Sequence, residues 1–219
     1  MKFDLVFRNI DFILKSALVT IKITSLSFIL GIIIAFIVGT LRYYEISKIL
    51  DKFLGIYVEI FRGTPLLIQL FFIYYGLPSI GIVMSSFTAA ILGLSLNIGA
   101  YMSEIVRSSI NSVNKGQEEA AYSLGYNQFQ RLRYIIYPQA IRIALPTLVN
   151  SFSALLKQSS LVSVLSITEL TRSGQLIYTR TSRPFEIYLF LGILYFTMVY
   201  IISSISKIVE KRINLKYKA

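Results

Sequence analysis

Two sets of polar residues lie inside long apolar stretches of the sequence. Asn97, Tyr101 and Glu104 are spaced i, i+4 and i+7, which places them on one face of a helix. The second set consists of Ser151, Gln158 and Ser159. Because polar groups are costly in apolar surroundings, such faces predict either the lining of a polar pathway or hydrogen bonds between helices. The residue pattern leaves both interpretations open.

Other kinds of chemistry are excluded by composition. The chain has no Cys and no His, so thiol catalysis and the commonest metal ligands are absent. It also has no Gly-x-x-x-x-Gly-Lys-Ser/Thr run to hold the phosphates of a nucleotide. We therefore expect no catalytic residue, no metal site and no cofactor bound by this chain.

The elements that position the polar faces are expected to cross a membrane. Hydrophobic residues make up 55% of the 219 residues, and the mean hydropathy is +0.66. Soluble domains contain about 45–50% apolar residues. Five apolar runs are long enough to span a bilayer, at 12–41, 55–76, 81–110, 138–165 and 187–208. The sequence predicts an all-α integral membrane protein in which residues 1–219 form one domain.

The net charge of +11 indicates membrane topology rather than nucleic-acid binding, because the basic residues gather at the ends of the apolar runs. Most of them fall on the side that also holds the C-terminus. Since cytoplasmic loops carry the excess of Lys and Arg, we expect the C-terminus inside and the N-terminus outside. The loop 169–186 argues against this orientation, because it would place three Arg residues outside.

A polar segment, 111–137, separates the third and fourth runs. The stretch "GQEEAAYSLGYNQFQRLRYIIYPQA", residues 116–140, covers most of it and the start of the fourth run, with a break at Gly125 and a helix start near Pro138. One interpretation is a surface helix on lipid headgroups, helped by Arg131 and Arg133. The other is a docking segment for a cytoplasmic partner. Small residues such as Ala121 would let another backbone approach closely, and composition does not decide between the two.

The residues of this segment carry a resemblance. "EAAYSLGYNQFQRLRYIIYP" resembles the EAA loop of permease subunits in ATP-binding-cassette (ABC) importers. The one departure is Tyr137, where that pattern has Leu. The stretches "EIFRGTPLLIQLFFIYYGLP", "PQAIRIALPTLVN" and "LLKQSSLVSVLSITEL" are similar, in order and spacing, to polar-amino-acid permeases of the histidine and glutamine type.

The resemblance implies a five-helix permease of the type I ABC importer fold in a bacterial plasma membrane. It implies a second permease copy or a homologous permease, a pair of ATPase subunits that use ATP and Mg²⁺, and an extracellular solute-binding protein. The substrate would be an amino acid, with membrane lipid as the surroundings and no nucleic acid. The residues expected to couple the chain to the ATPase are Glu118, Glu119, Ala120, Ala121, Gly125 and Tyr126.

Two departures from the similar permeases bear on the site. Those proteins usually have Arg-Gly-Gly-Ile where this chain has "RSSI", residues 107–110. They usually have Lys-Asp-Thr-Ser-Leu where it has "KQSSL", residues 157–161. Gln158 thus replaces an acid, and the role of that acid does not carry over to it. Its absence argues against selecting a cationic side chain by a buried countercharge at this position.

A further set of residues has an expected structural or gating role. Glu59 and Arg62 are spaced i, i+3 and can pair within one helix. Pro65 follows them and predicts a kink in the second run. Pro138 and Pro146 predict a distorted fourth helix that acts as a gate.

Two other function classes would each account for part of the sequence. A self-contained secondary transporter would couple intramembrane charges to an ion and often shows inverted repeats, but the sequence has no internal repeat. A membrane scaffold that recruits a cytoplasmic partner would explain the segment 111–137. It would not explain the two polar faces.

Overall fold

The computed structural model describes residues 4–215, and the regular structure within this range is helical. The long helices are α2 (Ile10–Tyr44), α3 (Lys48–Gly63), α5 (Ser86–Asn111), α8 (Tyr137–Gln158) and α10 (Pro184–Leu215). The short elements are α1 (Asp4–Arg8), α4 (Leu66–Phe71), η1 (Phe72–Gly76), η2 (Leu77–Ile80), α6 (Lys115–Ser123), α7 (Gln128–Gln130), η3 (Arg131–Ile136), η4 (Ser159–Leu165) and α9 (Leu170–Thr181). The predicted all-α class is confirmed.

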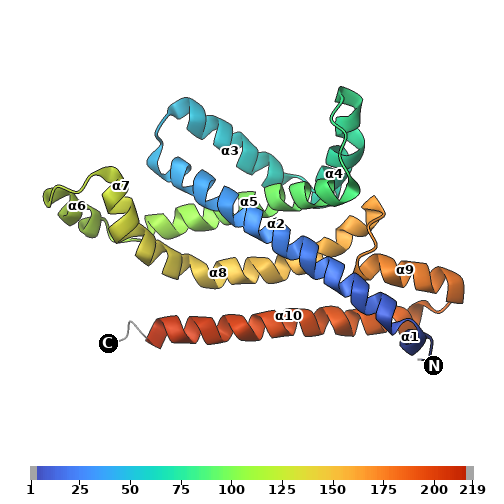
Figure 1. Ribbon diagram of the computed structural model, residues 1–219. Helices are drawn as coiled ribbons and strands as arrows, with labels where there is room; N and C mark the ends of the chain where they lie inside the picture. The colour runs from blue at the N-terminus through green and yellow to red at the C-terminus, as the bar shows by residue number, and fades with distance from the viewer. Residues whose placement is uncertain (1–3, 216–219) are drawn as a thin grey trace.

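The long helices run roughly along one axis (Figure 1). Helix α2 crosses α5, α8 runs antiparallel to α5, and α10 lies along α8. Helices α6 and α7 lie at the same end of the molecule as the last turns of α10, whereas α9 and α1 lie at the opposite end. By length and composition, α2, α5 and residues 184–205 of α10 qualify as membrane spans within the described residues. The bent pair formed by α3 and the segment 66–80 qualifies as a fourth.

The predicted span 55–76 is not one continuous helix. Helix α3 ends at Gly63, and the segment that begins with α4 leaves it at 110°. The reason is local, because a residue before proline is pushed out of the helical region and Thr64 is extended, with φ −117° and ψ 149°. After the break, α4 continues into the π-helix η1 and the 3₁₀-helix η2. In Figure 1 this segment turns away from the axis of the long helices, and its Leu70 and Ile73 remain in the core cluster with Leu94 of α5.

The third and fourth helices also differ from their expected bounds. Helix α5 begins at Ser86, where the side chain of Ser85 caps it by accepting a hydrogen bond from the N–H of Thr88. The fourth helix is preceded by the π-helix η3, has Pro138 in its first turn and contains Pro146. It changes to the 3₁₀-helix η4 after Gln158. The first five residues of the predicted third span, 81–85, and the end of the predicted fourth span, 159–165, are therefore not α-helical.

The loop expected at 169–186 contains a helix, α9. The carboxylate of Glu169 caps it by accepting hydrogen bonds from the N–H groups of Thr171 and Arg172, at 2.9 and 2.8 Å. Glu169 also accepts a bond from the hydroxyl of Tyr195 at 3.1 Å, and Thr20 of α2 lies 3.4 Å from it. Burial raises the pKa of the Glu169 carboxyl, while the capping N–H groups partly offset that rise. The cap ties α9 to α2 and α10.

The backbones of α2 and α5 approach each other closely where these helices cross. A Cβ added at Gly39 would lie 2.6 Å from the carbonyl oxygen of Ser103 and 3.0 Å from Cβ of Val106. A Cβ added at Gly31 would lie 2.5 Å from Ile98. Small residues let membrane helices pack at this separation. The α2–α5 pair forms much of the larger core cluster, which includes Ile23, Leu94 and Met102 among its fully buried members.

We predict that Gly39→Val destabilises the protein, because the added carbon atoms meet the backbone of α5, and overpacking of this kind costs about 1–3 kcal/mol. The measurement is the thermal unfolding midpoint of the detergent-solubilised protein. Gly192→Val is the matched control, since a Cβ there meets no atom within 4 Å. Equal midpoints for the two variants would contradict the close packing of α2 on α5.

Candidate functional site

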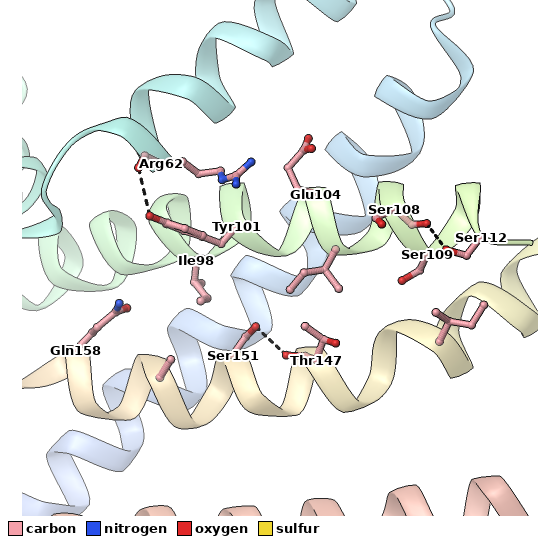
Figure 2. A pocket seen from close by; sticks show the side chains of 13 residues that line it. Arg62, Ile98, Tyr101, Glu104, Ser108, Ser109, Ser112, Thr147, Ser151 and Gln158 are labelled. Atoms are coloured by element: carbon pink, nitrogen blue, oxygen red, sulfur yellow. Dashed lines mark hydrogen bonds between the residues drawn. The ribbon is translucent and has the colours of Figure 1, made fainter.

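A cavity of about 690 Å³ lies between α5 and α8, with Arg62 at the end of α3 closing one side (Figure 2). Its apolar lining is Ile98, Ile105, Ile143 and Ala154. Its polar and charged lining is Arg62, Tyr101, Glu104, Ser108, Ser109, Ser112, Thr147, Ser151 and Gln158. The structure thus brings together Tyr101, Glu104, Ser151 and Gln158, four of the six residues expected along a pathway.

Arg62 and Tyr101 form the side of the cavity next to α3. The hydroxyl of Tyr101 donates a hydrogen bond to the carbonyl oxygen of Arg62 at 3.2 Å. The guanidinium of Arg62 lies 5.5 Å from the centroid of the Tyr101 ring. The expected ion pair between Glu59 and Arg62 is not formed in the described chain, and this prediction was wrong. The guanidinium turns to the ring on α5 instead of back along its own helix.

Glu104 is the centre of an ion-pair network. One of its carboxylate oxygens pairs with Arg42 of α2, and the other lies 2.8 Å from the Nη2 of Arg107. Arg42 also lies 3.5 Å from Asp51 of α3. The network links α2, α3 and α5 at one edge of the cavity. The charge of Glu104 is therefore compensated twice within the chain.

Gln158 and Ser151 line the α8 side. The hydroxyl of Ser151 donates to the carbonyl oxygen of Thr147 at 2.9 Å, one turn earlier in its own helix. The Oε1 atom of Gln158 is buried and accepts no hydrogen bond from any described residue. Gln158 is the last residue of α8, directly before the 3₁₀ turn. Its position makes its side chain part of the cavity wall.

Asn97 and Ser159 were expected with the pathway residues, but the structure places both outside the cavity lining. Asn97 is 4% exposed, and its amide donates to the carbonyl oxygen of Phe61 and to Oε1 of Gln69, both at 3.0 Å. Ser159 is fully buried and donates to the carbonyl oxygen of Leu156 at 2.7 Å. Asn97 therefore joins α5 to α3 and α4, which is the second of the two interpretations, whereas the bond of Ser159 stays within its own segment.

Gln69 has a role that the sequence analysis missed. Its Nε2 donates to the carbonyl oxygens of Phe61 and Thr64, at 3.0 and 3.1 Å, and to the Thr64 hydroxyl at 2.8 Å. These carbonyls lie at the break where Pro65 starts α4. A lone Gln in an apolar run was the signal that could have identified it.

The segment expected to dock on a partner forms α6, a turn and α7. Asn114 caps α6, and Gly125 has φ +83°, a conformation that favours glycine. Glu118 faces inward, where it lies 3.5 Å from the Nε of Arg131 and accepts a hydrogen bond from the hydroxyl of Tyr43 at 3.3 Å. Ala121 is 3% exposed. These inward contacts anchor α6 to α2 and η3.

The opposite face of this segment is open to solvent. Glu119 and Ala120 are exposed, and Tyr126 is 38% exposed. Three large apolar side chains also point outward: Tyr122 is 70% exposed, Leu124 78% and Phe129 65%. The sequence analysis did not assign these three to the docking surface, although their apolar type in a polar segment was a usable signal. We call Glu119, Ala120, Tyr122, Leu124 and Phe129 the α6 surface.

Comparison with known proteins adds an independent finding. Residues 27–215 match the family described as "Binding-protein-dependent transport system inner membrane component". The L-cystine transport system permease protein TcyB of Bacillus subtilis strain 168 is 39% identical over 196 residues, which are 89% of this chain and 83% of that protein.

Two solved structures share the fold. A chain of an amino acid ABC transporter crystallised with histidines is 36% identical, with a TM-score of 0.90 over 97% of this chain and 99% of that one. A chain of the MetNI methionine ABC transporter, in an inward-facing conformation, has a TM-score of 0.83 over 94% and 98%. At 19% identity, this second likeness concerns the fold alone.

We predict that Glu104→Gln lowers the thermal unfolding midpoint, because it leaves Arg42 and Arg107 without their shared counter-ion at a cost of roughly 1–3 kcal/mol. Asp51→Asn is the control, since its contact with Arg42 is longer, at 3.5 Å, and its side chain is 37% exposed. A midpoint for Glu104→Gln no lower than that for Asp51→Asn would show that the network does not hold these helices.

Proposed function

Since the chain belongs to the family of inner membrane components of binding-protein-dependent transport systems, we propose that it imports a polar amino acid as the permease subunit of an ABC transporter. Its resemblance to amino-acid ABC permeases is confirmed, and it has the type I ABC permease fold. In this family, ATP is hydrolysed by a separate subunit. The amino-acid class is supported by the cystine permease relative and by the amino acid transporter structure at 36% identity.

We further propose five membrane crossings, formed by α2, the broken pair α3 and α4, α5, α8 and α10. The C-terminus, α6 and α7 would lie in the cytoplasm of a bacterium and the N-terminus outside. Two features support this orientation. In the sequence the excess of Lys and Arg lies around α6 and near the end of α10, and in Figure 1 these two parts share one end of the molecule.

The observation that carries the proposal is the α6 surface. Exposed Tyr122 lies on α6 and exposed Leu124 directly follows it, and the other face of this helix is fixed by Glu118 and Ala121. A fixed helix with exposed apolar side chains can bind in a cleft of a partner protein, where such residues supply most of the binding energy. The partner would be one ATPase subunit of a pair, which binds the ATP and Mg²⁺, with a second permease completing the transporter.

Coupling follows from the way α6 is anchored. Arg131, which pairs with Glu118, belongs to η3, and η3 runs without a break into α8 and the cavity wall. Tyr43 joins the same carboxylate to the end of α2. A displacement of α6 by its ATPase partner would therefore move α8 and α2 with it. ATP binding would then bias the permease between inward-open and outward-open arrangements.

The cavity is the proposed pathway within the membrane. It offers hydrogen-bonding groups from both α5 and α8 where apolar helices alone would repel a zwitterion. An extracellular binding protein would deliver the amino acid at the end that holds α9 and the N-terminus. Pro138 and Pro146, in the helix that joins α6 to this cavity, would let α8 bend as a gate.

We predict that Leu124→Glu abolishes stimulated ATP hydrolysis, because it places a charge on the apolar centre of the α6 surface. The measurement is the ATPase rate of the nanodisc-embedded complex with its ATPase subunit, with and without the loaded binding protein, and we expect a loss of roughly tenfold or more. Leu124→Met keeps the apolar contact and should retain the stimulation. Stimulation that survives in Leu124→Glu would refute the coupling role of α6.

A further inference from the structure

One face of α2 carries three residues that contact α6 and the start of α8. Phe36, Thr40 and Tyr43 are spaced i, i+4 and i+7, so they share that face. The hydroxyl of Tyr43 donates to the carboxylate of Glu118 in α6, at 3.3 Å. Phe36 and Thr40 both contact Tyr137, the first residue of α8. Helices α6 and α8 therefore meet α2 on the same face.

The side chain of Tyr137 spans one turn of this face. Its hydroxyl lies 2.7 Å from the Oγ1 atom of Thr40, and either group can donate the hydrogen bond. Its ring stands edge-on to the ring of Phe36, with 5.9 Å between the centroids and 86° between the planes. Tyr137 is also the residue at which the sequence departs from the EAA pattern, which has Leu. A leucine side chain could pack here, but it has no hydroxyl to bond to Thr40.

The backbone at Tyr137 is a weak point in the connection between α6 and the cavity. Residues 131–136 form the π-helix η3, whose i→i+5 hydrogen bonds differ from those of the α-helix that follows. Pro138 comes directly after Tyr137 and has no N–H to bond to the preceding turn. Bending at this junction could therefore absorb a displacement of η3. Side-chain contacts must hold the junction if the displacement is to reach α8.

Thr40 belongs to a part of α2 that is packed closely on α5. It follows Gly39, where an added Cβ would lie 2.6 Å from the carbonyl oxygen of Ser103. The hydrogen bond from Tyr137 to Thr40 therefore fixes the start of α8 to the pair formed by α2 and α5.

Three side-chain contacts together join α6, α2 and the segment formed by η3 and α8. Glu118 of α6 lies 3.5 Å from the Nε of Arg131 in η3, and it accepts the bond from Tyr43 of α2. The bond between Thr40 and Tyr137 is the third contact, and it joins α2 to α8. Without the third contact, η3 would stay attached to α6, but the junction between η3 and α8 would be free to bend.

We propose that Tyr137 is a positioning residue for coupling, and that its hydrogen bond to Thr40 keeps the junction between η3 and α8 from bending when α6 moves. This inference rests on the proposed function. With the bond in place, α6, η3, α8 and α2 move as one body, and the signal passes between the ATPase and the cavity. Without it, the ATPase still binds α6, but part of each displacement is lost at the junction.

The test removes one hydroxyl at a time from the permease–ATPase complex in nanodiscs. Tyr137→Phe keeps the ring on Phe36, and Thr40→Val keeps the side-chain volume. The measurement is the ratio of ATP hydrolysis rates with and without the binding protein, saturated with an equimolar mixture of L-cystine and the twenty common amino acids. Each variant should lower this ratio about fivefold, as expected for the loss of one hydrogen bond. A mere loss of folded complex would lower both rates and leave the ratio unchanged.

Three further variants separate the hydrogen bond from other effects. Thr40→Ser keeps the hydroxyl and should retain the stimulation. Tyr134→Phe removes the hydroxyl of a tyrosine in η3 that is 60% exposed, and it should also retain the stimulation. The double variant of Tyr137→Phe and Thr40→Val should be about as impaired as either single variant, because both remove the same bond. Copurification of the ATPase is checked for each complex.

The outcomes distinguish this inference from the proposed function. Full stimulation in Tyr137→Phe or Thr40→Val overturns the inference, and so does a double variant whose loss is the product of the two single losses. Loss of stimulation in Thr40→Ser or Tyr134→Phe, or loss of the ATPase from Tyr137→Phe, overturns it too. In these cases, wild-type stimulation that Leu124→Glu abolishes would leave the importer assignment standing. If the wild type neither copurifies with the ATPase nor responds to the binding protein, the proposed function and this inference are both refuted.

Discussion

The structure depends on hydrogen bonds to the backbone carbonyl groups at the break between α3 and α4. In a bilayer no water is available to the carbonyl groups of an interrupted helix, so each needs a partner within the protein. Gln69 supplies donors to Phe61 and Thr64, and Asn97 of α5 supplies another to Phe61. These bonds hold the end of α3 against α5, and in that position Arg62 covers Tyr101. The cavity wall formed by Arg62 and Tyr101 therefore depends on these hydrogen bonds.

The cavity and the α6 surface are joined by continuous structure. Glu118 and Arg131 fix α6 to η3, and η3 leads directly into the helix that carries Ser151 and Gln158. A second connection runs from Glu118 through Tyr43 to α2, whose end also holds the Glu104 network through Arg42. The described chain therefore offers a mechanical path from the α6 surface to both walls of the cavity.

The sequence predicted the helical class, the long apolar helices and the polar segment between the third and fourth of them, because hydropathy and helical spacing are local properties. It placed Tyr101 and Glu104 together because they share one face of α5. It left the role of Asn97 open and was wrong for the Glu59–Arg62 pair, since both depend on the 110° turn at Pro65, whose direction is set by tertiary contacts. Helix α9 was missed because its cap uses a buried acid, Glu169, in a segment too polar to suggest burial.

Alternating access of the cavity is the central claim, and the absence of cysteine from the chain makes it directly measurable. A single cysteine introduced at Ser151 would report which side of the membrane reaches the cavity wall, using an impermeant thiol reagent and the complete transporter in proteoliposomes. The account predicts labelling from the cytoplasmic side without nucleotide and from the outer side when ATP is bound but not hydrolysed. Labelling that is independent of nucleotide, or that fails from both sides, would contradict it.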